Sequence, residues 1–304
     1  MEVTLKKDNM NTDTLYNERI SLLKTRLKLL EDKPEETYDS TLRALWFAAC
    51  GKPQSAESAM MQDLPELNEE CVTILDELIH RRINNIPLAH ITNRTRFMGI
   101  EMKADKRALI PRKETEILSK RALEISFKFP DANVIDVCCG AGNVGAAIAF
   151  YNPGARVYVA DLSSEAIELA QENIDLLDLN ERVKVMHSDL FEKFMNDDFF
   201  QKVDLVTCNP PYISSFKVSK MNSEIAENEP DLAFDGGMLG IKIIQRLIRE
   251  TPQLLSPGGW LVFEVGVGQG TMVMNLLIKS GLYSNVDSVS DNQGNIRVVL
   301  AMKK

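Results

Sequence analysis

From residue 133 onward, short apolar runs alternate with amphipathic stretches, and this alternation constrains the fold more than any other feature. The apolar runs predict buried strands at 133–137, 156–160, 183–187, 203–208, 260–265, 284–289 and 296–302. The stretches between them predict helices at about 142–151, 164–177, 238–254 and 269–280. Alternating strands and helices form a mostly parallel α/β sheet with helices on both faces. The last two strands are separated only by a turn at 291–294, so they are expected to pair antiparallel.

The first part of the chain predicts a small bundle of helices. Apolar residues recur at helical spacing over 15–30, 41–50 and 66–86, and loops rich in proline, glycine and acidic residues separate these stretches. A connector with a hairpin at 95–102 should follow, and then a helix from Glu114 to about residue 127. These patterns divide the chain into a helical domain (1–86), a linker with a β-hairpin (87–115) and an α/β domain (116–304).

Composition and charge limit the classes of function. The net charge of -9 argues against non-specific nucleic-acid binding, which depends on clustered Lys and Arg. The five cysteines lack paired spacing, so neither a disulfide framework nor a metal site is expected, and a reducing cytoplasm fits this pattern. No stretch approaches the roughly 20 apolar residues of a membrane span, and segment 1–11 is too polar to be a secretion signal.

The segment Asn209-Pro210-Pro211-Tyr212 directly follows an apolar run, so it is expected at the carboxyl end of a buried strand. Open parallel sheets bind ligands at that edge. A primary amide or an exocyclic amine offers two N–H donors, so a selective pocket must present acceptors and withhold donors. The Asn209 oxygen and proline carbonyls meet this need, and Tyr212 adds an aromatic wall. A proline-rich strand exit without any ligand would also explain these residues.

The turn at 136–145 predicts a nucleotide-type cofactor, because its glycines allow a tight turn and close approach of a ligand to bare backbone. About 20 residues on, at the end of the next strand, stands Asp161, where a carboxylate would hold a ribose. The turn is not G-x-G-x-x-G and no phosphate-binding lysine follows, so S-adenosylmethionine is favoured over NAD or ATP. Asp189 would lie near the adenine amino group or else cap a helix. The expected cofactor residues are Asp136, Gly140, Ala141, Gly142, Asp161, Leu162, Asp189 and Asn209.

Several motifs together resemble one family. They are Pro87-Leu88-Ala89-His90-Ile91, Phe97-Met98-Gly99, the segment 109–116 (LIPRKETE), the turn 136–142, Asn209-Pro210-Pro211-Tyr212, Glu229-Pro230, Phe234-Asp235-Gly236-Gly237 and Pro257-Gly258-Gly259-Trp260. From about residue 40 to its end, the chain resembles the release factor glutamine N5-methyltransferases of the PrmC/HemK type.

The resemblance implies a class I methyltransferase domain of Rossmann-like fold, with seven strands and an antiparallel last strand, behind a helical substrate-recognition domain. It implies transfer of a methyl group from S-adenosylmethionine, leaving S-adenosylhomocysteine, to the glutamine of the GGQ motif in peptide chain release factors. Asn209 and Pro210 would then bind the substrate amide and Tyr212 would pack on it. Further substrate contacts are expected from Arg112, Glu114 and Pro211.

The sequence departs from the family pattern at Asn93, Lys113, Cys138 and Asn228. Cys138 replaces the first glycine of the turn, which it fits if its φ stays negative. Three other interpretations fit parts of the pattern. One is a paralogue that methylates another protein glutamine or a small-molecule amide. Another is a DNA adenine N6-methyltransferase, which must flip a base and grip phosphates. The third is a non-catalytic module that binds S-adenosylmethionine.

Overall fold

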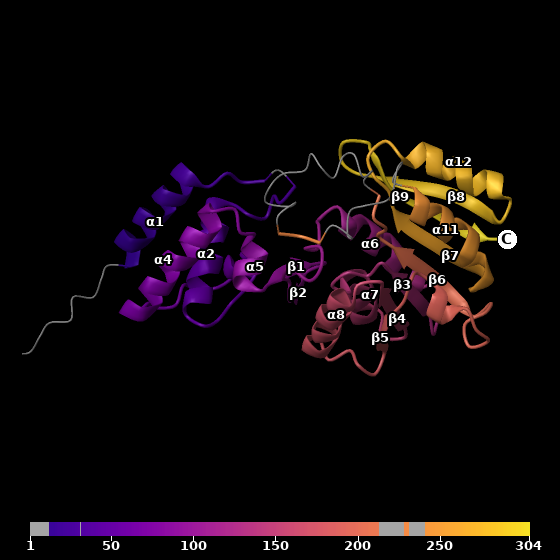
Figure 1. Ribbon diagram of the computed structural model, residues 1–304, viewed down its shortest axis with the longest axis horizontal. Helices are drawn as coiled ribbons and strands as arrows, with labels where there is room; N and C mark the ends of the chain where they lie inside the picture. The colour runs from indigo at the N-terminus through magenta and orange to yellow at the C-terminus, as the bar shows by residue number, and fades with distance from the viewer. Residues whose placement is uncertain (1–11, 31, 213–227, 231–240) are drawn as a thin grey trace, which may run out of the picture. The chain divides into compact units, whose positions relative to one another are not determined.

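The computed structural model describes residues 12–30, 32–212, 228–230 and 241–304. The chain divides into two compact units, Met1–Arg94 and Thr95–Lys304 (Figure 1). The polar segment 1–11, the motif Phe234-Asp235-Gly236-Gly237 and the first residues of the helix expected at 238–254 lie outside the described residues. Within the described ranges, no helix combines the length and the apolar composition needed to cross a membrane.

The first unit is helical, as its sequence pattern predicts. Its helices are α1 (Thr12–Arg26), α2 (Tyr38–Ala49), α3 (Ala56–Ala59), α4 (Glu69–Ile83) and α5 (Leu88–Thr92). Thr37 and Ser40 form a reciprocal capping box at the start of α2, which satisfies backbone donors that a helix end leaves open. Leu42, Trp46 and Leu75 are fully buried in the core between the helices. The helices expected at 15–30, 41–50 and 66–86 correspond to α1, α2 and α4, whereas α3 and α5 were not expected.

The second unit opens with a hairpin and continues as alternating strands and helices. The hairpin pairs β1 (Thr95–Phe97) with β2 (Ile100–Met102). The helices are α6 (Thr115–Ser126), α7 (Asn143–Tyr151), α8 (Ser164–Leu176), α11 (Lys242–Glu250) and α12 (Gly270–Ser280), with short 3-10 turns η1 (Glu192–Phe194) and η3 (Thr251–Gln253). The strands are β3 (Asn133–Val137), β4 (Arg156–Asp161), β5 (Val183–His187), β6 (Val203–Cys208), β7 (Leu255–Glu264), β8 (Tyr283–Ser290) and β9 (Ile296–Lys303). The hairpin assigned to a separate linker therefore lies within this unit.

The strands β3 to β9 form one seven-stranded sheet in the order β5-β4-β3-β6-β7-β9-β8. The pairs from β5 to β7 are parallel, and β9 runs antiparallel to both of its neighbours. This arrangement confirms the predicted fold class. The strand order reverses between β3 and β6. The strands that follow β3 in the sequence, β4 and β5, lie on one side of it, whereas β6 and the later strands lie on the other side. In open α/β sheets the ligand crevice lies at this reversal, beyond the carboxyl ends of the strands.

Helices cover both faces of the sheet, as the nearly continuous apolar strands require (Figure 1). On one face, buried residues of α6, α7 and α8 pack against alternate residues of the central strands, such as Val134 and Leu205. On the other face, α11 and α12 pack against the intervening residues, such as Ile135 and Val206. The two cores hold the carboxyl ends of β3, β4 and β6 in register, and these ends carry the polar residues singled out in the sequence.

One strand begins earlier than its sequence predicts. Pro257, Gly258 and Gly259 favour a turn before a strand at 260–265, yet β7 already pairs with β6 at Leu255. The register shifts between Val203 and Leu205, so the Pro-Gly-Gly segment forms an irregularity inside the strand. A Cβ on Gly259 would lie 2.9 Å from the carbonyl oxygen of Val203, which is why this irregularity needs glycine.

Candidate functional site

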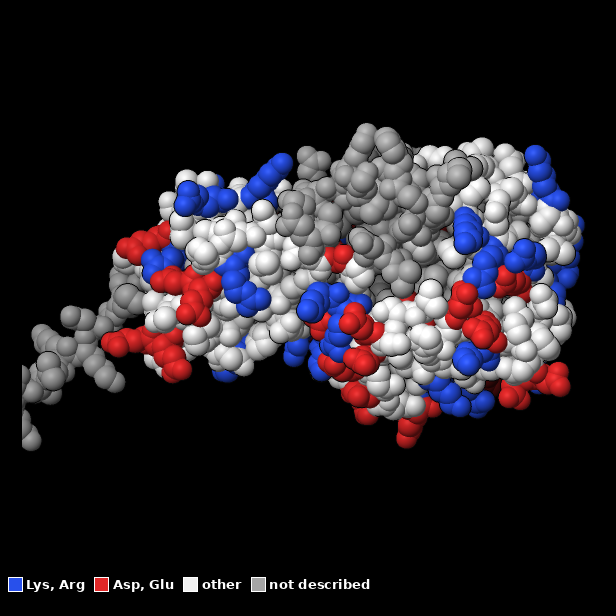
Figure 2. All heavy atoms as spheres, in the orientation of Figure 1, with Lys and Arg blue, Asp and Glu red and all other residues white. Residues whose placement is uncertain are grey.

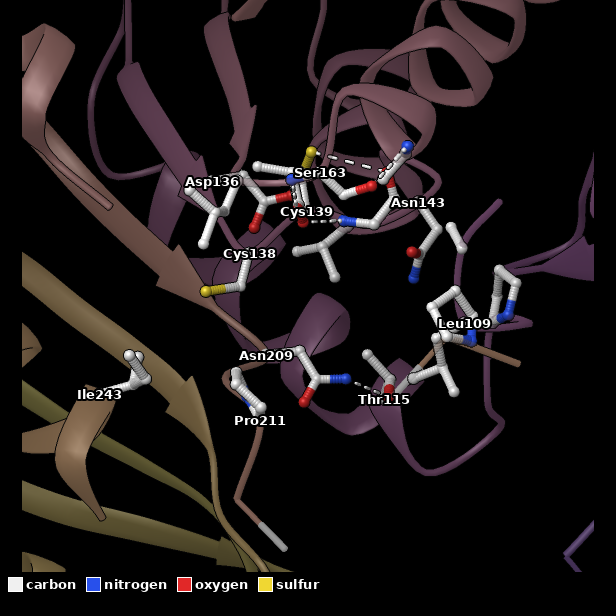
Figure 3. Close-up of a pocket in the computed structure, with 18 of the residues that line it drawn as sticks. Leu109, Thr115, Asp136, Cys138, Cys139, Asn143, Ser163, Asn209, Pro211 and Ile243 are labelled. Atoms are coloured by element: carbon white, nitrogen blue, oxygen red, sulfur yellow. Dashed lines mark hydrogen bonds between the residues drawn. The ribbon is translucent and has the colours of Figure 1, made fainter. Parts of the chain in front are cut away.

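A pocket lies beyond the carboxyl ends of β3, β4 and β6, at the reversal of the strand order (Figure 3). Eight of the residues predicted for the site line it: Arg112, Asp136, Gly140, Asp161, Leu162, Asp189, Asn209 and Pro211. Five others do not line it: Glu114, Ala141, Gly142, Pro210 and Tyr212. The tertiary structure thus brings the predicted cofactor carboxylates, Asn209 and Arg112 to one cavity, although they are distant in the sequence.

The turn after β3 lets α7 start close to the sheet. Gly140 and Gly142 have φ values of 53° and 77°, a region that glycine enters without steric cost. Gly142 packs against α8, since a Cβ there would lie 3.2 Å from the Cβ of Ala170. A Cβ on Gly145 would lie 2.3 Å from Cγ1 of Val159, so α7 can approach β4 only with glycine at this position. Gly142 and Ala141 therefore shape the turn from behind the pocket wall.

Cys138 has a φ of 55°, so the expectation that it would keep a negative φ is wrong. The turn demands the left-handed region at this position, where an L residue with a Cβ is strained. Asn93, another departure from the family pattern, also lies in this region, with a φ of 53° at the end of α5. Asparagine tolerates this conformation better than other non-glycine residues, so Asn93 is a conservative replacement for glycine.

Asp161 ties the end of β4 to the glycine turn. Its Oδ2 accepts a bond from Gly140 N–H (2.9 Å), and its Oδ1 accepts one from Ser163 N–H (2.9 Å). Burial raises the pKa of this carboxyl, while the backbone N–H groups oppose the shift. The two parts of the predicted cofactor motif are therefore one hydrogen-bonded unit. A carboxylate has about four acceptor sites, so the backbone N–H groups of Gly140, Ser163 and Leu162 leave a site with which Asp161 is able to hold a ribose hydroxyl at the pocket wall.

Asp136 is fully buried at the end of β3 and also borders the pocket. Its Oδ1 accepts from the Thr207 hydroxyl (2.7 Å), and its Oδ2 accepts from Gly145 N–H (3.0 Å). Burial raises the pKa of this carboxyl to about 7, with the nearby charge of Asp161 adding to the shift. These two carboxylates favour a ligand that carries positive charge, such as the sulfonium of S-adenosylmethionine, so the residues present fit that cofactor.

Asp189 is not a helix cap, the alternative that its sequence allowed. Its Oδ1 accepts from Nη1 of Arg246 on α11 at 2.6 Å, while its neighbour Ser188 accepts from Lys193 N–H at 3.2 Å. Asp189 still lines the pocket and is close to half exposed. An adenine amino group would therefore share this carboxylate with Arg246.

Asn209 stands at the end of β6, where its amide is held by a residue of α6. Its Nδ2 donates to the Thr115 hydroxyl at 3.2 Å (Figure 3). Among the described residues, no donor is bonded to Asn209 Oδ1, which remains an acceptor for a ligand. Pro211 contributes an apolar wall, whereas Pro210 is buried and is not among the described residues that line the pocket. Tyr212 turns its hydroxyl away to donate to Glu264 Oε1 at 2.8 Å.

The segment before α6 is fixed by a buried ion pair. Arg112 donates from Nη2 to Oε1 of Glu229 at 2.6 Å, and Oε2 of the same glutamate accepts from Ile110 N–H at 2.9 Å. The guanidinium of Arg112 therefore both lines the pocket and holds Glu229 in place. Glu114, in contrast, lies 3.7 Å from the guanidinium of Arg297 and outside the pocket lining.

The structure also identifies polar residues that the sequence interpretation did not assign to the site. Thr115, Glu229, Glu264 and Arg297 each bond to a predicted site residue or to its direct neighbour. Thr115 and Glu229 belong to the motifs 109–116 and Glu229-Pro230, which supported the family resemblance without a role for either residue. Glu264 carried a signal of its own, because a carboxylate at the end of an apolar strand must find partners when it is buried.

Comparisons with known proteins identify the family. The family model described as the methyltransferase small domain matches residues 115–294. A release factor glutamine methyltransferase from Clostridium acetobutylicum is 33% identical over 238 residues, which cover 78% of this chain and 82% of that protein. One from Bacillus anthracis is 34% identical over 245 residues, covering 80% and 85%. The solved catalytic domain of hMettl16, 14% identical with a TM-score of 0.53 over 79% of this chain and 83% of that one, shares the fold. The chain therefore belongs to the release factor glutamine methyltransferase family.

Proposed function

We propose that this methyltransferase transfers the methyl group of S-adenosylmethionine to the side-chain amide nitrogen (N5) of a glutamine in a peptide chain release factor, at its GGQ motif. The observation that carries the proposal is the amide of Asn209, whose oxygen remains an acceptor beside a pocket with buried carboxylates. The family resemblance implies a second acceptor, the backbone carbonyl of Pro210, although Pro210 is buried and is not among the described residues that line the pocket. The family membership of the chain supports the identity of the substrate.

An amide nitrogen is a weak nucleophile, because its lone pair is delocalised into the carbonyl, so the site must stabilise the transition state of its attack. Bound S-adenosylmethionine supplies an electrophilic methyl group. Asn209 Oδ1 and the Pro210 carbonyl would accept the two N–H bonds of the substrate amide and so place negative electrostatics where positive charge develops on nitrogen. Fixing both N–H groups also aligns the nitrogen for in-line attack. No general base is required before the transfer.

Replacing Asn209 by alanine tests the role of this side chain. We expect Asn209→Ala to lose about 100-fold in kcat, comparable to the loss of one electrostatic contact in other active sites, because one of the two acceptors disappears. Its affinity for S-adenosylmethionine should stay close to that of the wild type. Single-turnover methyl transfer and calorimetric cofactor binding measure the two quantities. Near-normal turnover would remove Asn209 from the catalytic role.

The substrate itself is tested with labelled S-adenosylmethionine and three acceptors: a release factor, the same factor with its GGQ glutamine changed to alanine, and unmethylated DNA. Label should enter only the unmodified factor. On the face drawn in Figure 2, basic and acidic side chains are interspersed instead of forming a basic stripe, and this agrees with a protein substrate better than with duplex DNA. Equal labelling of the alanine variant, or labelling of DNA alone, would contradict the proposal.

Recognition of the release factor is assigned, within the same proposal, to the helical unit Met1–Arg94, as the family resemblance implies; the described residues that line the pocket belong to the other unit. Hydrogen exchange of the whole protein with and without the release factor tests this assignment. Backbone amides of α1 to α5 should exchange more slowly in the complex. Unchanged exchange throughout these helices, with protection elsewhere, would move the recognition surface out of the first unit.

A further inference from the structure

Behind the pocket wall, three side chains converge on one buried carboxylate. Glu264, at the end of β7, is 1% exposed. Its Oε2 accepts from the Thr115 hydroxyl at 2.7 Å, and its Oε1 accepts from the Tyr212 hydroxyl at 2.8 Å and from Nη2 of Arg297 at 3.2 Å. Gln269 adds a bond from its Nε2 to the carbonyl of Tyr212 at 3.0 Å. The segment 209–212 is thus held at both of its ends.

The direction of these bonds determines how Asn209 presents its amide. A threonine hydroxyl has a single hydrogen. Because Thr115 donates that hydrogen to Glu264, its oxygen can only accept from Asn209, and it receives the Nδ2–H at 3.2 Å. The opposite orientation of the amide would place Oδ1 against an oxygen that has no hydrogen left to donate. The Nδ2 group is therefore turned toward Thr115, and Oδ1 is left for a ligand.

We propose that Thr115 and Glu264 are positioning residues that set the Asn209 amide in the orientation that accepts an N–H bond from the substrate. This inference rests on the proposed function, since the acceptor matters for a substrate that presents an amide NH2. Arg297 is a further donor to the Glu264 carboxylate. It also lies 3.5 Å from the Tyr212 oxygen, and each of the three described side chains that bond to the carboxylate, Thr115, Tyr212 and Arg297, donates to it. An acceptor-only carboxylate is what forces the Thr115 hydrogen in its direction.

The variant Glu264→Gln should reverse the orientation of the Asn209 amide without removing side-chain volume. The amide oxygen of a glutamine would face Arg297 and Tyr212, because the guanidinium has only donors. Its NH2 group would then face Thr115 and donate to the hydroxyl oxygen. The Thr115 hydrogen would become available to Asn209 Oδ1, and the Asn209 amide would turn its NH2 group toward the ligand. Two donors would then meet where the substrate nitrogen must bind.

Thr115 offers a matched pair of variants. Thr115→Ser keeps the hydroxyl and should preserve the orientation of Asn209, whereas Thr115→Val keeps the shape and removes the hydroxyl. We expect Thr115→Val and Glu264→Gln each to lower kcat for methyl transfer by about tenfold or more, with the dissociation constant of S-adenosylmethionine changed less than about threefold. Thr115→Ser should stay within about threefold of the wild type in both quantities. A purely structural role would instead lower kcat and cofactor affinity together, and that result, or wild-type turnover in Thr115→Val and Glu264→Gln, would overturn the inference.

A second measurement does not depend on turnover. The side-chain NH2 signal of Asn209, assigned by its loss in Asn209→Ala, reports directly on the bond to Thr115 in a nitrogen-15 NMR spectrum of the full chain. It should shift and exchange faster with solvent in Thr115→Val and in Glu264→Gln, and stay unchanged in Thr115→Ser. An unchanged signal in the first two variants would overturn the inference even if the release factor is methylated. If the wild type methylates no release factor while the signal shifts as described, the proposed substrate fails and the positioning of Asn209 stands.

Discussion

Cys138 is a residue whose backbone conformation favours glycine, with its φ of 55°. An L residue in the left-handed region is strained by about 1–2 kcal/mol, while glycine costs somewhat more conformational entropy on folding. We expect Cys138→Gly to be more stable than Cys138→Ala by about 0.5–1 kcal/mol, because the two variants differ only in the strained Cβ. Urea unfolding of both variants measures this difference. An alanine variant that is equally or more stable would show that the position carries no strain.

Asp136 is a single residue that couples folding to pH. Its pKa rises from an ordinary 3.8 to about 7 on folding, because the carboxyl becomes buried. Between these values the folded protein keeps a proton that the unfolded chain releases, so the contribution of this group to the free energy of unfolding falls as pH rises through that window and is constant above it.

The variant Asp136→Asn removes this titration and keeps the shape of the side chain. As pH falls from about 7 to 5, the wild type should gain about 1.4 kcal/mol per pH unit in unfolding free energy relative to the variant. Urea unfolding of both proteins at several pH values gives the difference, in which other titrating groups cancel. A difference that is independent of pH would mean that Asp136 stays ionised throughout.

At the scale of elements, the packing of α7 on the sheet depends on Gly145. A Cβ there would lie 2.3 Å from Val159, a stiff β-branched side chain of β4, and 3.3 Å from Oδ2 of Asp136. Gly145→Ala should therefore lower the free energy of unfolding by about 1–3 kcal/mol through overpacking. It should also weaken binding of S-adenosylmethionine, because α7 carries the N–H group that holds Asp136.

Gly281 provides the control for this element. It follows α12 with a φ of 70°, and a Cβ added there would meet no atom within 4 Å, so Gly281→Ala adds backbone strain without a clash. Differential scanning calorimetry with and without cofactor compares the two variants. Both should be destabilised, but only Gly145→Ala should bind the cofactor more weakly. Unaltered cofactor affinity in Gly145→Ala would separate the packing of α7 from the pocket.

At the scale of the whole molecule, the pocket belongs to one unit. Those of its lining residues that the structure describes all fall within Thr95–Lys304. We expect S-adenosylmethionine to slow hydrogen exchange in β3, β4, β6 and the turns that follow them, because a ligand stabilises the state that binds it. Exchange in α1 to α5 should not change when the cofactor alone is added. Protection of these helices by the cofactor would show that the two units respond to it together.

The sequence alone was sufficient for the features that depend on neighbours along the chain. Apolar periodicity predicted the strands, and the spacing from the glycine turn to Asp161 predicted a cofactor site, because side-chain burial and tight turns are local requirements. The apolar run before Asn209 placed this residue at the end of β6 for the same reason, and Asn209 and Pro211 line the pocket there. Among the strands of the sheet, the errors were confined to boundaries, such as the early start of β7.

Only the tertiary structure decided which distant side chains meet. The bond from Thr115 to Glu264 joins residues 149 positions apart, and the bond from Ile110 to Glu229 joins residues 119 apart. No local pattern encodes such pairs, because they follow from the strand order that brings α6 beside β6 and β7. The same holds for the φ of Cys138, which the whole turn imposes. The sequence thus determined that an asparagine amide stands at the end of β6, and the packed structure decided, through Thr115 and Glu264, which end of that amide faces a ligand.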